Sequence, residues 1–160
     1  MFSHRRPPSR LLVLVALVAL AGCGARTRVD PPPTPPADVA KHCAALHGEL
    51  PEEVAGAARS DTDPDSELTA AWGGSAIVLR CGIPKPPRMA DPDQDGVEVN
   101  GVSWLLEPLD GGRFRFTTGL RVAYTEVVVD AATAKDRGAG LLVGISAAVA
   151  KTVPEGIASY

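Results

Sequence analysis

The positions of apolar residues divide the chain into three parts. Residues 11–20 are an unbroken run of Leu, Val and Ala, whereas residues 24–37 contain five prolines and few apolar side chains. From residue 38 onward, apolar positions recur with the periods of helices and strands. We therefore expect a leader over residues 1–22, a proline-rich tether over residues 23–37, and a single domain over residues 38–160.

A helix is expected at the start of the domain. Val39, Cys43, Leu46 and Leu50 follow one another at spacings of four, three and four residues, so they share one face of a helix. Pro51 ends this helix, because proline has no amide hydrogen to continue the backbone ladder. Residues 52–67 are rich in Asp, Ser, Pro and Ala and predict a loop.

Strands are expected at residues 68–72, 75–81, 97–99, 102–104, 114–117 and 121–130. Gly73-Gly74 and Asn100-Gly101 separate the first two pairs of these strands, and such dipeptides are typical of two-residue hairpin turns. Ile77, Leu79 and Cys81 share one face of their strand, and Arg80 is expected to point away from it. A change of alternation near Thr125 predicts a bulge in the last strand.

A second helix closes the pattern. Leu141, Leu142, Ile145, Ala148 and Val149 repeat at helical spacing. The proline at position 154 ends this helix. The order of elements predicts an α+β fold, in which an antiparallel sheet of about five to six strands built from hairpins carries an N-terminal and a C-terminal helix on one face.

The leader has the parts of a bacterial export signal. Arg5, Arg6 and Arg10 precede an apolar run of ten residues, and spanning a bilayer requires about 20. The run ends in Leu-Ala-Gly before Cys23, which resembles the lipobox of bacterial lipoproteins. That resemblance implies cleavage before Cys23 and acyl chains such as palmitate on it, which anchor a protein effectively permanently. Pro7 after the arginine pair favours general secretion over twin-arginine export.

Charge excludes one class of partner. The chain carries 16 basic and 19 acidic residues, and removal of the leader's three arginines moves the net charge from −3 to −6. A domain this acidic offers no basic patch for nucleic acid. The tether over Gly24–Ala37 should run in an extended polyproline conformation and hold the domain about 40 Å from the lipid.

Cys43 and Cys81 remain once Cys23 is lipidated. An even pair in an exported chain favours a disulfide, and two buried free thiols are the alternative. If formed, the bond would stabilise the fold by about 4 kcal/mol in the chain-entropy model.

Three strings resemble the DUF3515 family of actinobacterial secreted or lipid-anchored proteins of unknown function. They are residues 68–82, residues 97–106 and Pro154-Glu155-Gly156. The resemblance extends over about residues 38–158. It implies the lipoprotein location and the Cys43–Cys81 pair, but no catalytic residues, because the family has none established.

A weak calcium motif lies between the predicted hairpins. Asp91, Asp93 and Asp95 alternate before Gly96, as in the first half of an EF-hand loop. The position that should supply a bidentate glutamate is Val102, so an acidic turn without metal is the favoured interpretation. No other cofactor is expected.

Two tryptophans lie beside the predicted hairpin turns. Packing in the core is the favoured use of both Trp72 and Trp104 in a chain with so few aromatic residues. If a surface patch recognises a ligand, we expect it to contain Trp72, Arg80 and Glu98. No arrangement of Ser, Cys and His indicates nucleophilic catalysis.

These observations favour a protein on the extracytoplasmic face of the cell membrane, anchored through lipid on Cys23. We expect a non-enzymatic binding or accessory module of the cell envelope, with an envelope protein or cell-wall component as its partner. The alternatives are an envelope enzyme whose site comes together only in three dimensions, and a calcium-stabilised module.

Overall fold

An open sheet of eight strands forms the centre of the molecule. The structure is a computed structural model that describes residues 26–158. The strands are β2 (Glu53–Val54), β3 (Ala57–Ser60), β5 (Thr69–Trp72), β6 (Ile77–Cys81), β7 (Gly96–Val99), β8 (Val102–Pro108), β9 (Phe114–Thr118) and β10 (Thr125–Val129). Their spatial order is β2-β3-β5-β6-β10-β9-β8-β7, and every neighbouring pair is antiparallel.

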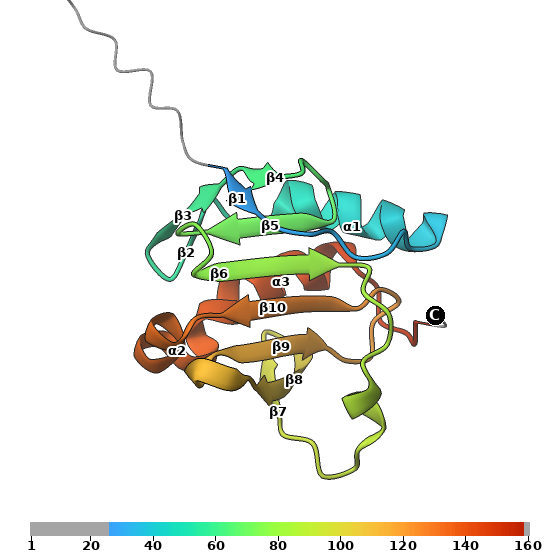
Figure 1. The fold of residues 1–160 in the computed structure, drawn as a ribbon. Helices are drawn as coiled ribbons and strands as arrows, with labels where there is room; N and C mark the ends of the chain where they lie inside the picture. Colours follow the sequence, from blue (N-terminus) through green and yellow to red (C-terminus); the bar gives the residue numbers. More distant parts are fainter. Residues whose placement is uncertain (1–25, 159–160) are drawn as a thin grey trace, which may run out of the picture.

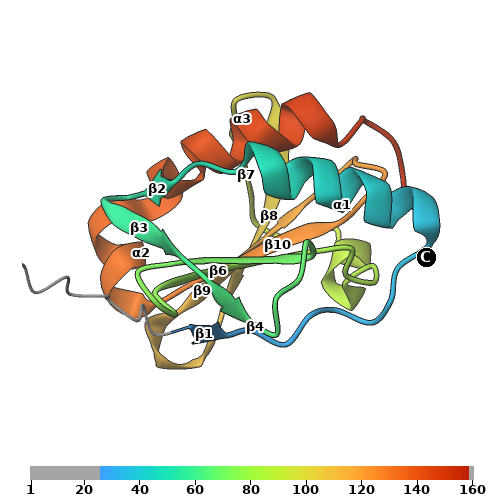
Figure 2. The same cartoon turned by 90° about the horizontal axis from the view of Figure 1, so that it is seen from above.

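Helices cover one face of this sheet. The α-helices are α1 (Ala37–Glu49), α2 (Ala131–Arg137) and α3 (Val143–Thr152), and the 3-10 helices are η1 (Pro87–Ala90), η2 (Asp110–Gly112) and η3 (Gly138–Leu142). Figures 1 and 2 show α1 and α3 lying side by side behind the sheet, with α2 at one end. The predicted α+β class is confirmed, and the sheet has more strands than expected.

The core lies between the sheet and the two long helices. Ile77, Leu79 and Cys81 of β6 all face it and are at most 2% exposed, as their alternation predicts. Both tryptophans are buried there, and the indole N–H of each donates a hydrogen bond. Trp72 Nε1 donates to Pro51 O at 2.9 Å, and Trp104 Nε1 donates to a serine hydroxyl on α3 at 2.9 Å.

A disulfide joins the helical layer to the sheet. Cys43 of α1 and Cys81 of β6 are bonded, with their Cα atoms 5.5 Å apart, and both side chains are buried. The predicted pairing is therefore confirmed. The bond closes a loop with a sequence separation of 38 residues, which corresponds to about 4 kcal/mol of stabilisation in the chain-entropy model.

The segment expected to be a free tether packs on the domain, and for its described part that expectation is wrong. β1 (Thr27–Arg28) pairs in parallel with β4 (Thr62–Asp63), and Val29 is 4% exposed. Residues 30–36 then cross the open face to reach α1, with Pro32 and Pro35 buried. We call residues 27–36 the strap. Its proline rings are apolar, so they pack although they cannot join a ladder.

The hairpins form where the turn residues predict them. Asn100 and Gly101 both have positive φ and connect β7 to β8 directly, as the Asn-Gly dipeptide predicts. The turn between β5 and β6 spans residues 73–76 instead of two residues. The expected loop over residues 52–67 contains the short strands β2, β3 and β4.

The last sheet strand starts later than expected, because the residues before it bond elsewhere. The predicted strand 121–130 is regular only from Thr125, the position of the expected bulge. Val122 N donates to Pro154 O at 3.1 Å, and the buried Arg121 side chain donates to Val153 O at 3.0 Å. The same guanidinium donates to Gly101 O at 2.9 Å, so it ties the β7–β8 turn to the end of α3.

Gly156 is required by this C-terminal packing. A Cβ atom at this position would lie 2.6 Å from Cγ1 of Val122, which is closer than real Cβ contacts. We expect Gly156→Ala to lower the free energy of unfolding by about 2 kcal/mol in urea denaturation. Gly48→Ala is the control, because its Cβ would meet nothing within 4 Å and helical alanine adds about 0.5 kcal/mol. Equal effects of the two substitutions would contradict this role.

Candidate functional site

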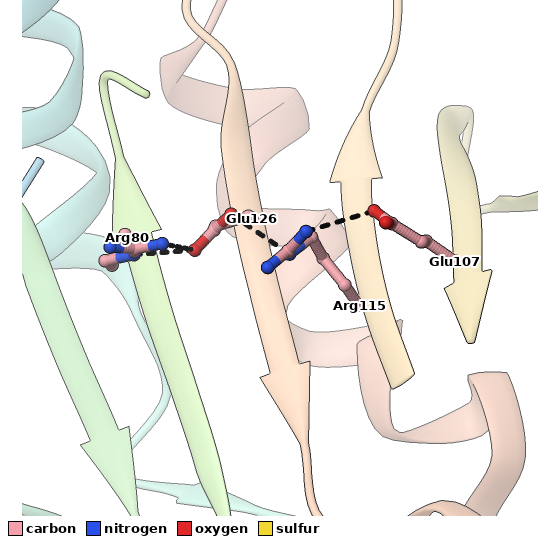
Figure 3. A network of polar contacts seen from close by, with 4 residues as sticks. All are labelled: Arg80, Glu107, Arg115 and Glu126. Atoms are coloured by element: carbon pink, nitrogen blue, oxygen red, sulfur yellow. Dashed lines mark hydrogen bonds and ion pairs between the residues drawn. The ribbon is translucent and has the colours of Figure 1, made fainter. Parts of the chain in front are cut away.

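The face of the sheet opposite the helices carries a ladder of charged residues. Arg80 (β6), Glu126 (β10), Arg115 (β9) and Glu107 (β8) lie on four neighbouring strands, as Figure 3 shows. Arg80 is directly opposite Glu126, and Glu107 is directly opposite Arg115. The ladder therefore alternates positive and negative side chains across the middle of the sheet. Arg80 points away from the core, as its place in the alternation predicts.

Glu126 is the buried centre of this ladder. Its side chain is 6% exposed, and Arg80 Nε donates to its Oε1 at 2.6 Å. Arg115 Nε lies 3.4 Å from its Oε2, and Arg115 Nη1 donates to Glu107 Oε2 at 3.1 Å. A buried carboxylate held between two guanidinium groups is compensated in charge, so it fits a structural role better than that of a free catalytic acid.

A groove lies at the far side of the same face. It has a volume of about 570 Å³ and runs between the loop after β6, strands β7 and β8, and the two chain segments near residues 120 and 157. Its apolar lining includes Met89, Val97, Leu105, Leu120, Tyr124 and Ile157, and its polar lining includes Lys85, Asp95, Glu98 and Ser103. A mostly apolar surface with a few polar groups is typical of binding sites. We call this feature the groove.

Two exposed apolar side chains form part of the groove. Leu120 is 67% exposed and Ile157 is 77% exposed. Leu120 also has a φ of +52°, a conformation that a bulky L-residue rarely adopts. Gly156 N donates to Leu120 O at 3.0 Å, so the C-terminal segment holds this residue in its strained conformation. Strain of this kind persists where the surrounding structure imposes it, and it concentrates at functional sites.

Tyr124 is the buried titratable group of the groove. Burial raises the pKa of its phenol above the ordinary value, because the charged form loses solvation. The phenol is therefore neutral at physiological pH, which suits it to hydrogen bonding better than to proton abstraction.

A polar hollow of about 380 Å³ surrounds His47 on the other side of the molecule. Its lining includes Arg59, Asp61, Asp65 and Thr62. Burial, and then the positive charge of Arg59, lower the pKa of His47, so the imidazole is neutral near pH 7. No Ser, Thr or Cys side chain within residues 26–158 hydrogen-bonds to it, and Thr62 Oγ1 pairs instead with a threonine hydroxyl of β5 at 3.1 Å. The described hollow thus lacks the nucleophile–base pair of covalent catalysis.

Comparison with known protein families gives one result. The model of the family described as "Protein of unknown function (DUF3515)" matches residues 9–158. The chain belongs to the DUF3515 family. Comparison with curated proteins found no matching relative, and comparison with solved structures found no matching chain. None of the helices among residues 26–158 is long and apolar enough to cross a membrane.

The proposed surface patch is not present in this DUF3515 protein. Trp72 is fully buried on the helical side of the sheet, whereas Arg80 lies on the opposite face and Glu98 is exposed on β7. Trp72 packs in the core, which is the use that the sequence favoured for it, so a surface patch cannot include this side chain. Cys23, the predicted lipidation site, lies outside the described residues, as does the predicted leader.

The calcium motif forms an exposed acidic loop. Asp91 Oδ1 accepts a hydrogen bond from Asp93 N at 3.0 Å, and Asp95 O accepts one from Leu106 N at 2.9 Å. Within the described residues, no group of three or more His, Cys, Asp or Glu side chains is placed to hold a metal ion. The geometry therefore gives the calcium hypothesis no support.

Sequence reasoning missed the groove of this DUF3515 domain. Its lining comes from segments up to about 70 residues apart, and Leu120 and Ile157 lie outside regular helices and strands. A large apolar residue directly after glycine, as in Gly119-Leu120 and Gly156-Ile157, was the one available signal.

The ladder should contribute strongly to stability. Glu126→Gln removes the negative charge between two guanidinium groups that are about one third exposed, so we expect a loss of about 2 kcal/mol in the free energy of unfolding. Urea denaturation is the appropriate measurement, because guanidinium chloride would screen the pairs. Glu98→Gln, at an exposed position, should change stability by less than about 0.5 kcal/mol. A loss of similar size in both variants would show that the ladder has no special role.

Proposed function

We propose that this DUF3515 protein is a lipid-anchored binding module of the cell envelope, working on the extracytoplasmic face of the membrane. In this proposal the groove holds an apolar part of an envelope protein or cell-wall component. The observation that carries it is the pair of exposed apolar side chains, Leu120 and Ile157, which line a groove with a volume of about 570 Å³. Polar groups on the same lining, such as Lys85 and Glu98, would orient the partner.

A binding role fits the titratable groups better than catalysis does. The buried carboxylate of Glu126 is compensated by two arginines, and the buried phenol of Tyr124 is neutral at physiological pH. His47 is neutral as well, but it has no hydroxyl or thiol partner among residues 26–158. Acid–base or nucleophilic chemistry needs such groups placed against one another.

Two observations support the location. The lipobox-like string before Cys23 supports attachment to lipid, and the Cys43–Cys81 disulfide is the kind of bond that forms and persists outside the cytoplasm. The disulfide and the lipid together use all three cysteines of the chain.

A photocrosslinking amino acid at position 157 tests the groove. In living cells, we expect it to capture one discrete envelope component, because Ile157 lines the proposed contact. The same amino acid at Val143, which is 51% exposed and does not line the groove, is the control and should not capture that component. The Leu120→Glu substitution should abolish the product formed from position 157. Identical products from both positions, or none from position 157, would contradict binding in the groove.

Replacement of the anchor residue tests the location. We expect Cys23→Ala to accumulate as an uncleaved precursor or to leave the membrane fraction, because no thiol remains to receive lipid. Membrane fractionation with intact-mass measurement distinguishes these states. A variant that matures and fractionates like the wild type would show that Cys23 carries no anchor.

A further inference from the structure

We propose that the lipid holds the β1–β4 side of the domain against the bilayer, so that the groove opens on the side away from the membrane. The partner in the groove is then a component of the layer immediately above the bilayer. This inference rests on the lipid attachment to Cys23 that belongs to the proposed function.

The connection between lipid and domain is short. Thr27 N donates to Asp61 O at 2.8 Å, and Val29 N donates to Asp63 O at 3.1 Å, so the backbone is fixed to β4 from residue 27 onward. Three residues separate Cys23 from Thr27. A fully extended chain spans at most about 3.6 Å per residue, so the lipidated residue lies within about 14 Å of the packed backbone whatever its conformation.

The strap beyond β1 is packed on the domain, so it does not lengthen the connection between the lipid and the domain. Val29 and Pro32 are buried, and Pro35 packs against the backbone at Gly82, where a Cβ atom would lie 3.0 Å from the proline ring. Its prolines therefore cannot extend as a spacer without leaving these contacts. This removes the reach of about 40 Å that their composition alone suggests.

The groove lies near the opposite edge of the sheet from this attachment. The hydrogen bond between the hydroxyls of Thr62 and Thr69 places β4 beside β5, near one edge of the sheet. The groove is lined by β7 and β8 at the opposite edge, with β6, β10 and β9 between. Neighbouring strands are about 4.8 Å apart, so β5 and β8 are separated by about 19 Å. Figure 1 shows β1 and β4 at the top of the sheet and β7 and β8 at its lower edge.

These dimensions limit where the partner is found. A domain of this length has a diameter of about 36 Å from the usual scaling of the radius of gyration. Together with a connection of at most about 14 Å, this places the groove no farther than about 50 Å from the bilayer surface. In this orientation the groove does not face the lipid, and its partner lies within that distance of the bilayer.

Fluorescence quenching in vesicles tests the orientation. The natural lipidated protein is reconstituted with lipids that carry a nitroxide quencher on the headgroup. A fluorophore is placed on an introduced cysteine, which is the one free thiol when Cys43 and Cys81 are bonded and Cys23 is acylated. We compare Asp65→Cys, exposed next to β4, with Gln94→Cys, exposed at the groove. Quenching should be several-fold stronger at position 65.

A long Gly-Ser insert between Gly24 and Ala25 provides the second arm. It should reduce quenching at position 65 to the level of position 94 while the protein still floats with the vesicles. Equal quenching at both positions without the insert, or stronger quenching at position 94, would overturn the orientation and leave the anchor intact. Failure of the natural protein to float with vesicles would overturn the lipid attachment, and with it both proposals.

Discussion

The Cys43–Cys81 disulfide is the point at which the three layers of this molecule meet. It bonds α1 to the end of β6, and the next residue, Gly82, makes the close contact with Pro35 of the strap. Gly82 has a φ of +84°, so a side chain there would be strained as well as crowded. The helical layer, the sheet and the strap therefore meet at one covalent bond, of a kind that is stable in an oxidising compartment.

The two faces of the sheet are covered by different kinds of side-chain contact. The helical face buries a conventional apolar core that includes both tryptophans. Among residues 26–158, no α-helix covers the other face. At its centre, charged side chains pair across neighbouring strands, with Glu126 held between Arg80 and Arg115. The strap covers part of this face with proline rings. An eight-stranded sheet with a single helical layer is thus kept from exposing a wide apolar surface.

Much of the fold was predictable because its periodic elements are long enough to show their period. The stripe through Val39, Cys43 and Leu46 predicted α1, and Asn100-Gly101 predicted the β7–β8 turn. Strands β2, β3 and β4 have two to four residues, too few for an alternation to be recognised. The groove and the ladder were not predictable, since both depend on strand register: nothing local to Arg80 indicates that Glu126 lies opposite.

The packing of the strap also affects how readily a protease could cut the chain at residues 27–36. Proteases cut chains preferentially at exposed, flexible segments, and a proline-rich stalk between anchor and domain would be such a segment. Here residues 27–36 are held by the β1–β4 pairing and by buried prolines, so a protease must first open that part of the fold to reach them. Resistance to cleavage within the strap would then be a property of the folded domain itself.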